Sequence, residues 1–156
     1  MLIGVTQPVS PSLAQCELTH LAREPIDVAR ATTQHTAYEH VLSSFGITIV
    51  GVSAGSELSD AVFIQDTAIV LDEVAVITRP GVPSRRAESA AVSSVLAAYR
   101  PLHAMKAPAT LDGGDVLRLT RALSMGPIEP HERSRHRAAS ELRDAVRVRC
   151  CPGRVH

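Results

Sequence analysis

The order of the predicted elements constrains the fold of this sequence more than any other feature. Amphipathic spacing predicts a helix that begins near Pro25 and ends at Gly46, and a second helix over residues 85–100. The apolar positions that give the first helix its period are Tyr38, Val41, Leu42 and Phe45. The predicted strands are residues 47–52, 62–71 and 74–80 after the first helix, and residues 102–106, 116–119 and 122–125 after the second. Because close strands favour hairpins, the repeated order predicts an α/β fold built from ββαβ units.

The composition is that of one globular domain, with 156 residues of which 45% are hydrophobic and 21% charged. The formal net charge is zero, so no overall basic field would attract nucleic acid or an anionic membrane surface. No segment approaches the roughly 20 apolar residues that span a bilayer. Cysteines occur at Cys16, Cys150 and Cys151, which form neither a C-x-x-C pair nor a spaced framework. We expect a cytoplasmic protein with no nucleic-acid or membrane partner.

The pattern of strands and helices stops after Gly126. Residues 127–156 are rich in arginine, alternate arginine with acid and contain few large apolar side chains. Such a composition predicts a solvated helix or a disordered tail. The sequence therefore divides into a folded part, 1–126, and an aberrant tail, 127–156.

Two further motifs lack the context that their chemistry requires. Residues 51–55 match the G-x-S-x-G nucleophile elbow, but no helix pattern follows, so we interpret Ser53 as a loop residue. His35 and His40 are five residues apart and do not share a helix face, so they form no zinc motif. We predict neither a metal nor a cofactor.

Acids near the ends of strands and turns are more informative. Asp60 and Asp66 flank strand residues of alternating character, and Asp112 and Asp115 straddle a Gly-Gly turn. Carboxylates there would suit a cationic guanidinium, while an amino acid that carries one also has an α-carboxylate that an arginine can bind. Candidate partners for that carboxylate are Arg79, Arg85 and Arg86. The pattern suggests free arginine or a relative of it as a small-molecule ligand, and ordinary turn acids with surface ion pairs stay the alternative.

Three stretches resemble a known family. They are CELTHLAREPIDVARATTQHTAYEHVL, DAVFIQDTAIVLDEVAVITRPGVPSRRAE and TLDGGDVLRL, and they lie within residues 13–126. These stretches resemble the guanidino-group-modifying, or pentein, superfamily, most closely its dimethylarginine dimethylaminohydrolase-like members. The resemblance implies a propeller of five ββαβ units around a central site, of which this chain would hold about half. It also implies a cysteine thiolate that attacks the guanidinium carbon and a histidine that protonates the departing amine.

Site residues follow from the resemblance position by position. It implies that Leu18 caps the substrate, that Phe63 lines the pocket and that Arg85 takes the substrate carboxylate. It assigns the polar groups of the substrate to Asp60 and Asp66, and it places Asp112 as the acid beside the catalytic histidine. Gln65 stands where the family frequently has an acid, and it is carried over as a substrate-binding position.

The resemblance ends at Gly126, before the positions of the family's catalytic histidine and cysteine. Cys150 and Cys151 lie in the arginine-rich run, and we do not assign either as the nucleophile. Codons displaced by one nucleotide could restore the family's Arg-Thr-Asn motif, so we hypothesise a frameshift. We expect a methylated-arginine hydrolase by family, inactive in this chain and possible as a homodimer at full length. The open alternatives are an arginine deiminase, an amidinotransferase or a non-catalytic binding protein.

Overall fold

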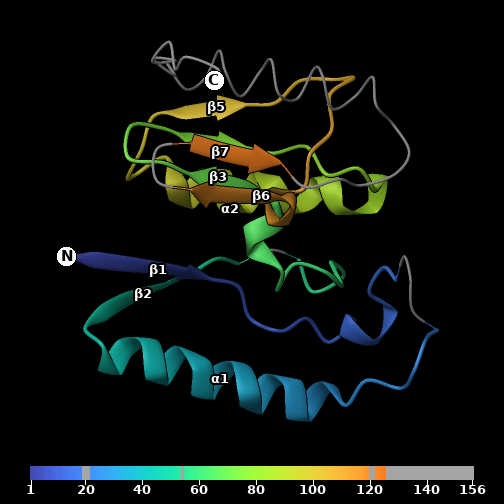
Figure 1. Ribbon diagram of the computed structural model, residues 1–156. Coiled ribbons are helices and arrows are strands. Elements are labelled where there is room, and N and C mark those ends of the chain that lie inside the picture. The colour runs from blue at the N-terminus through green and yellow to red at the C-terminus, as the bar shows by residue number, and fades with distance from the viewer. Residues whose placement is uncertain (19–21, 54, 120–121, 126–156) are drawn as a thin grey trace, which may run out of the picture.

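The computed structural model describes residues 1–18, 22–53, 55–119 and 122–125 of the chain. The first unit contains β1 (Leu2–Thr6), α1 (Val28–Ser44) and β2 (Ile47–Gly51). β1 and β2 pair in parallel, from Leu2 opposite Ile47 to Thr6 opposite Gly51, and α1 is the crossover between them (Figure 1). The Asp27 carboxylate caps the start of α1 by accepting from the Arg30 N–H at 2.9 Å. After the end of the helix, Gly46 has a φ of 78°, a conformation that favours glycine.

The second unit contains β3 (Ala68–Val70), β4 (Ala75–Ile77), α2 (Glu88–Leu96) and β5 (Leu102–Ala104). Its strands lie in the order β3-β4-β5, antiparallel in the hairpin and parallel across the helix crossover. A third sheet is the antiparallel hairpin of β6 (Val116–Leu119) and β7 (Ala122–Met125). The predicted α/β order of ββαβ units is therefore confirmed, and the sheets form no closed ring within the described part of the chain.

Several predicted elements need correction, and β4 and β5 are shorter than the predicted strands 74–80 and 102–106. β3 is shorter than the predicted strand 62–71 because residues Ile64–Asp66 form a 3₁₀ turn, in which the Thr67 N–H donates to the Ile64 carbonyl at 3.1 Å. The predicted helix 85–100 divides into a 3₁₀ turn, Pro83–Ala87, and the shorter α2. β1 was not predicted at all, although its sequence LIGVT is rich in residues that favour strands.

The core lies on both faces of β4, whose side chains alternate between two apolar clusters. Ala75 and Ile77 pack towards α2, whereas Val76 faces Leu111 and other residues of the segment that follows β5. The first cluster consists of Val52, Ala75, Ile77, Val92 and Leu96, and the second of Ile69, Leu71, Val76, Met105, Ala109 and Leu111. A sheet buried on two faces gives rigid support to the loops at its ends.

The helix predicted around residues 25–46 is confirmed as α1, but its packing differs from the expectation. Tyr38, Val41 and Phe45 are 55%, 53% and 77% exposed, and only Leu42 of the four apolar positions is partly buried. The inner face is instead partly polar, since the Thr6 hydroxyl donates to Glu39 at 2.6 Å. Across the described segments, no helix is long and apolar enough to cross a membrane.

Candidate functional site

Arg85 lies at the centre of a cluster of acidic side chains. The turn Pro83–Ala87 turns its side chain inward, and the residue is only 9% exposed. Its guanidinium donates from Nη1 to Asp66 Oδ2 at 2.8 Å, and from Nε and Nη2 to the two carboxylate oxygens of Glu88 at 3.3 and 3.0 Å. Nη2 also donates to the Asp60 carbonyl oxygen at 3.4 Å. Four of the five N–H donors of Arg85 are therefore engaged inside the protein.

Asp66 is held from two further directions. Its Oδ1 accepts from the Gly114 N–H at 3.1 Å, and its carbonyl oxygen accepts from the Thr78 hydroxyl at 2.6 Å. A Cβ atom at Gly114 would lie 2.5 Å from Asp66 Oδ1, and a Cβ at Gly113 would overlap the Gln65 carbonyl oxygen. The Gly-Gly turn thus lets one segment of backbone approach another and fixes the Asp66 carboxylate.

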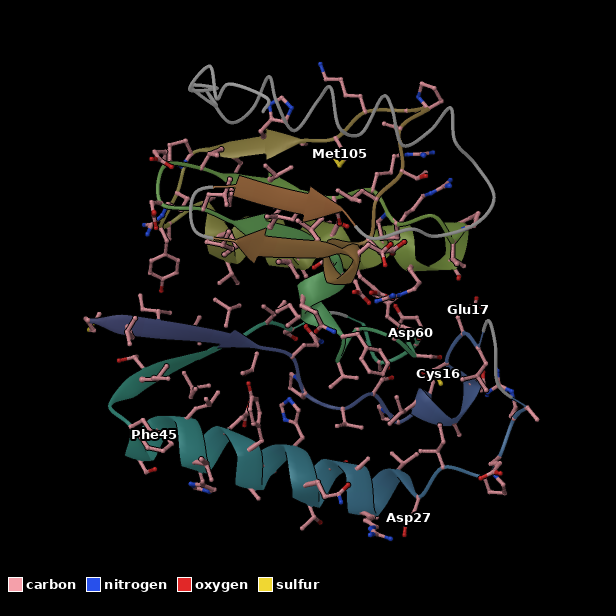
Figure 2. The ribbon with its side chains drawn as sticks, in the orientation of Figure 1. Cys16, Glu17, Asp27, Phe45, Asp60 and Met105 are labelled. Atoms are coloured by element: carbon pink, nitrogen blue, oxygen red, sulfur yellow. The ribbon has the colours of Figure 1, made fainter. Side chains whose placement is uncertain are left out.

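Asp60 reaches the same cluster from the loop before β3. Its side chain accepts from the Glu17 N–H, with distances of 3.2 and 3.1 Å to its two oxygens, and the residue is 7% exposed. Figure 2 shows Asp60 facing Glu17 and the buried Cys16 on the segment that precedes α1. The Glu17 carboxylate in turn accepts from the Ser84 hydroxyl at 2.7 Å, next to Arg85.

Burial and mutual repulsion act on the ionisation of this cluster. Burial raises the pKa of Asp112, which accepts weakly from the Gly81 N–H at 3.4 Å, and the nearby charge of Asp66 raises it further. Burial likewise raises the pKa of Glu88, against the stabilising contact with Arg85, and the charges of Asp60 and Asp66 add to the rise. Burial acts to lower the pKa of Arg85, but its contacts with Glu88 and Asp66 outweigh this and raise it.

The structure brings together most of the residues singled out in the sequence and separates others. Asp60, Asp66, Arg85 and Asp112 belong to one electrostatic cluster. Phe63 connects Asp60 to Asp66 through backbone hydrogen bonds of 2.9 and 3.0 Å, and its side chain is 41% exposed. Leu18, which follows Glu17, is 38% exposed.

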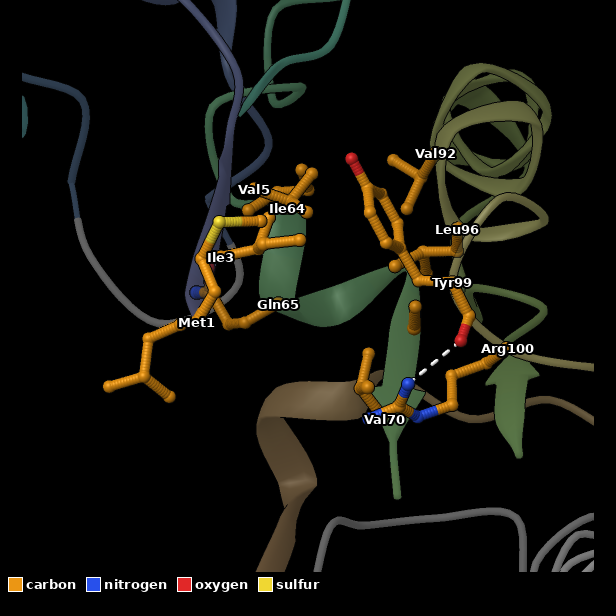
Figure 3. A pocket seen from close by; sticks show the side chains of 12 residues that line it. Met1, Ile3, Val5, Ile64, Gln65, Val70, Val92, Leu96, Tyr99 and Arg100 are labelled. Atoms are coloured by element: carbon orange, nitrogen blue, oxygen red, sulfur yellow. Dashed lines mark hydrogen bonds between the residues drawn. The ribbon is translucent and has the colours of Figure 1, made fainter. Parts of the chain in front are cut away.

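Gln65 lines a different cavity from the acid cluster. This apolar cavity, of about 550 Å³, lies between β1 and the helix α2 (Figure 3). Val5, Ile64 and Leu96 line it together with Gln65, and the Arg100 side chain donates to the Tyr99 carbonyl oxygen at 2.7 Å at its edge.

Glu88 is the member of the cluster that the sequence analysis missed. It is 3% exposed and binds Arg85 through both carboxylate oxygens. The available signal was its position three residues after Arg85 at the start of a helix, where side chains at i and i+3 meet. Arg79 and Arg86, which the sequence grouped with Arg85, donate to backbone carbonyl groups instead.

Other chemistry finds little support in the described residues. Ser53 lies exposed in the loop after β2, as predicted, and the described residues 55–63 form no helix. No group of three or more histidine, cysteine or acidic side chains within the described ranges is arranged to hold a metal ion.

Curated proteins of similar sequence include two dimethylarginine dimethylaminohydrolases, whereas no protein-family model matches the chain. It is 39% identical over 118 residues to N(G),N(G)-dimethylarginine dimethylaminohydrolase of Streptomyces coelicolor, which covers 75% of this chain and 46% of that protein. It is 31% identical over 101 residues to the protein of the same name from Pseudomonas aeruginosa, covering 64% and 39%. The chain thus spans less than half the length of each relative.

Solved structures share the fold. A mutant of dimethylarginine dimethylaminohydrolase from Pseudomonas aeruginosa, complexed with citrulline, superposes with a TM-score of 0.81 at 23% identity, covering 93% of this chain and 58% of that one. The N-terminal domain of ArgZ, a cyanobacterial arginine dihydrolase, gives a TM-score of 0.74 at 18% identity, covering 90% and 54%. The chain is therefore similar in sequence to dimethylarginine dimethylaminohydrolases and shares the fold of their solved structures, over about half the length of these relatives.

Proposed function

We propose that the acid cluster binds the guanidino group of a methylated arginine, which the complete enzyme hydrolyses to citrulline and dimethylamine. The observation that carries this proposal is the excess of negative charge in a buried place. Within the part of the chain that the structure describes, Asp60, Asp66, Glu88 and Asp112 surround one internal cation, Arg85. Because repulsion among carboxylates is costly away from water, a second guanidinium would be attracted there. The names of the curated relatives support the same substrate class.

Asp66 is the carboxylate best placed to bind such a cation. An ionised carboxylate has about four lone-pair positions. Asp66 uses one oxygen for Arg85 and the other for the Gly114 N–H, so acceptor capacity is left on both. Planar guanidinium groups pair well with carboxylates, as Arg85 does with both oxygens of Glu88. We propose that Asp60 assists from the opposite side and that Leu18 and Phe63 shield the bound ligand.

Arg85 has two roles in this proposal. It fixes the orientation of Asp66 by donating to the carboxylate. Its fifth N–H, which has no partner among the described residues, would donate to the α-carboxylate of the substrate. We leave Gln65 out of the proposed site because it lines the separate apolar cavity.

The covalent steps need groups beyond the described residues. By family resemblance, a thiolate attacks the guanidinium carbon and a histidine, which Asp112 would orient, protonates the departing amine. Within the described part of the chain the free cysteine is the buried Cys16, which we do not assign as the nucleophile. Because the resemblance ends before the positions of the family's catalytic histidine and cysteine, we propose that this 156-residue chain has no hydrolase activity, and citrulline formation from dimethylarginine above a no-enzyme control would refute this.

We further propose that a displaced reading frame encodes the rest of the enzyme after Gly126. Residues 127–156, on which this hypothesis depends, lie outside the described residues. The test is the nucleotide sequence: codons that cannot spell Arg-Thr-Asn in the displaced frame would end the idea.

The substrate assignment is tested in a chain whose frame is restored. Asp66→Asn keeps the shape of the side chain but replaces a charged acceptor by a neutral amide. Losing such a buried charged contact costs about 2–5 kcal/mol, so kcat/KM for dimethylarginine should fall at least tenfold. Asp27→Asn is the control, because asparagine also caps helices well and the residue lies at the start of α1.

Arg85→Ala separates its two roles. If Arg85 contacts the α-carboxylate, the variant should lose more activity on dimethylarginine than on a simple alkylguanidine that lacks this group. Equal losses on both compounds would show that Arg85 acts only by orienting Asp66.

The products identify the reaction: dimethylamine indicates the proposed hydrolase, ammonia a deiminase, and a new guanidino compound an amidinotransferase. A ligand that binds without any product would favour the non-catalytic binding protein.

A further inference from the structure

Arg79 and Arg86 are electrostatically separate from the acid cluster. Within the described part of the chain, the ion pairs that involve arginine are those of Arg85 with Asp66 and Glu88. The charges that act on the pKa values of Glu88 and Asp112 also include Arg85 but neither Arg79 nor Arg86. Among the described residues, these two half-buried cations thus have no carboxylate partner.

Both arginines line one small pocket. It has a volume of about 340 Å³ and lies between the N-terminal half of α2 and the ends of β4 and β5. Ser89 and Ser93 of α2 contribute to its wall, and none of the described residues that line it is acidic. The described lining of the pocket therefore carries two positive charges and no negative one.

Backbone carbonyl groups hold the two guanidinium groups in place and leave donors over. Arg79 donates from Nη1 to the Ala109 carbonyl at 3.2 Å, while Arg86 donates from Nε to Pro80 and from Nη2 to Gly81, both at 3.2 Å. Arg79 Nε and Nη2 and Arg86 Nη1 have no such partner among the described residues, and neither has the Ser93 hydroxyl. Oriented N–H groups with unused donors favour oxyanions, which accept several of them at once.

We propose that this pocket is a binding site for a small oxyanion, a phosphate or a carboxylate group. The anion would accept from Arg79 and Arg86, with the Ser93 hydroxyl as a third donor. Pro80 lines this pocket, and the N–H of the next residue, Gly81, donates to Asp112 of the acid cluster. The segment Pro80–Gly81 therefore connects the pocket to the acid cluster. It does not depend on the proposed hydrolase function, so each can fail without the other.

The test is binding of inorganic phosphate, and separately of acetate, to the full chain by calorimetry at constant ionic strength. Either anion should bind at millimolar concentrations, and the tighter one identifies the class of ligand. Arg79→Gln and Arg86→Gln should each weaken binding at least about tenfold, since each removes charge-assisted contacts. Ser93→Ala, which removes only a hydroxyl on α2, should weaken it about fivefold and guards against misfolding of the arginine variants.

Arg100→Gln is the matched control. Arg100 is also held by two backbone carbonyl groups, those of Leu71 and Tyr99, but it lines the other cavity. Its variant should bind phosphate and acetate like the parent chain. Absence of binding by the parent, unchanged affinity in Arg86→Gln and Ser93→Ala, or an equal loss in Arg100→Gln would each overturn the proposal.

Discussion

Individual side chains in the acid cluster depend on one another because Arg85 is the shared cation. Glu88 is the most buried of its partners, with a side chain only 3% exposed, and it binds Arg85 through two oxygens. A buried ion pair adds little net stability, but removal of one partner leaves the other charge uncompensated. Removal of one partner should therefore cost more stability than the intact ion pair contributes.

Glu88→Gln should destabilise the fold by about 3 kcal/mol, because Arg85 would lose its two-oxygen acceptor while staying buried. Urea denaturation followed by circular dichroism measures the change. Glu73→Gln, at an exposed position in the β3–β4 turn, should change the midpoint little. Equal midpoints for the two variants would contradict the central role of Glu88.

Asp112 should make stability fall with rising pH. Burial raises its folded pKa above the ordinary value of 3.8, so the native state holds this proton more tightly than the unfolded chain. The native state is consequently penalised as pH rises from 3.8 through the raised pKa. Asp112→Asn stays neutral, so its stability relative to the parent should improve across this window and then level off. A stability difference that is independent of pH would contradict the raised pKa.

At the scale of elements, short turns fix the site more than the long helix does. The turns Ile64–Asp66, Pro83–Ala87 and Gly113–Asp115 present Asp66, Arg85 and the Gly114 N–H to one another. The first of these turns leads into β3, the second into α2 and the third into β6. Small changes in these turns should therefore affect the site directly.

Gly114→Ala tests the close approach of two turns. The new Cβ would lie 2.5 Å from Asp66 Oδ1, so either the carboxylate or the backbone must move. Overpacking of this kind costs about 1–3 kcal/mol, and the unfolding midpoint should fall accordingly. Gly51→Ala is the matched control, since nothing lies within 4 Å of its added Cβ. A similar midpoint for both variants would show that the turn yields easily.

The whole molecule exposes surfaces that proteins ordinarily cover. The described β1–β2 sheet has only two strands, and α1 presents Tyr38, Val41 and Phe45 to solvent. Open strand edges and contiguous apolar side chains both favour association. These features agree with a chain that spans less than half the length of its curated relatives.

We expect the chain to associate when it is produced alone. Sedimentation velocity should show species heavier than a monomer whose share grows with concentration. Val41→Thr combined with Phe45→Ser should reduce association without loss of helical signal, because both side chains are more than half exposed. A monodisperse, cooperatively unfolding parent monomer would contradict this expectation.

The sequence by itself determined the order of helices and strands from α1 onwards, although not β1, because helix and strand periods and turn residues are local properties of the chain. It also identified Asp60, Asp66, Arg85 and Asp112 as candidate site residues, although the roles assigned to them stay predictions. Only the tertiary structure decided that Glu88 joins Arg85, that Arg79 and Arg86 face another pocket, and that α1 turns much of its apolar stripe outward. The physical reason is distance along the chain: Asp66 and Gly114 are 48 residues apart, so their contact depends on how the folded sheet brings separate turns together.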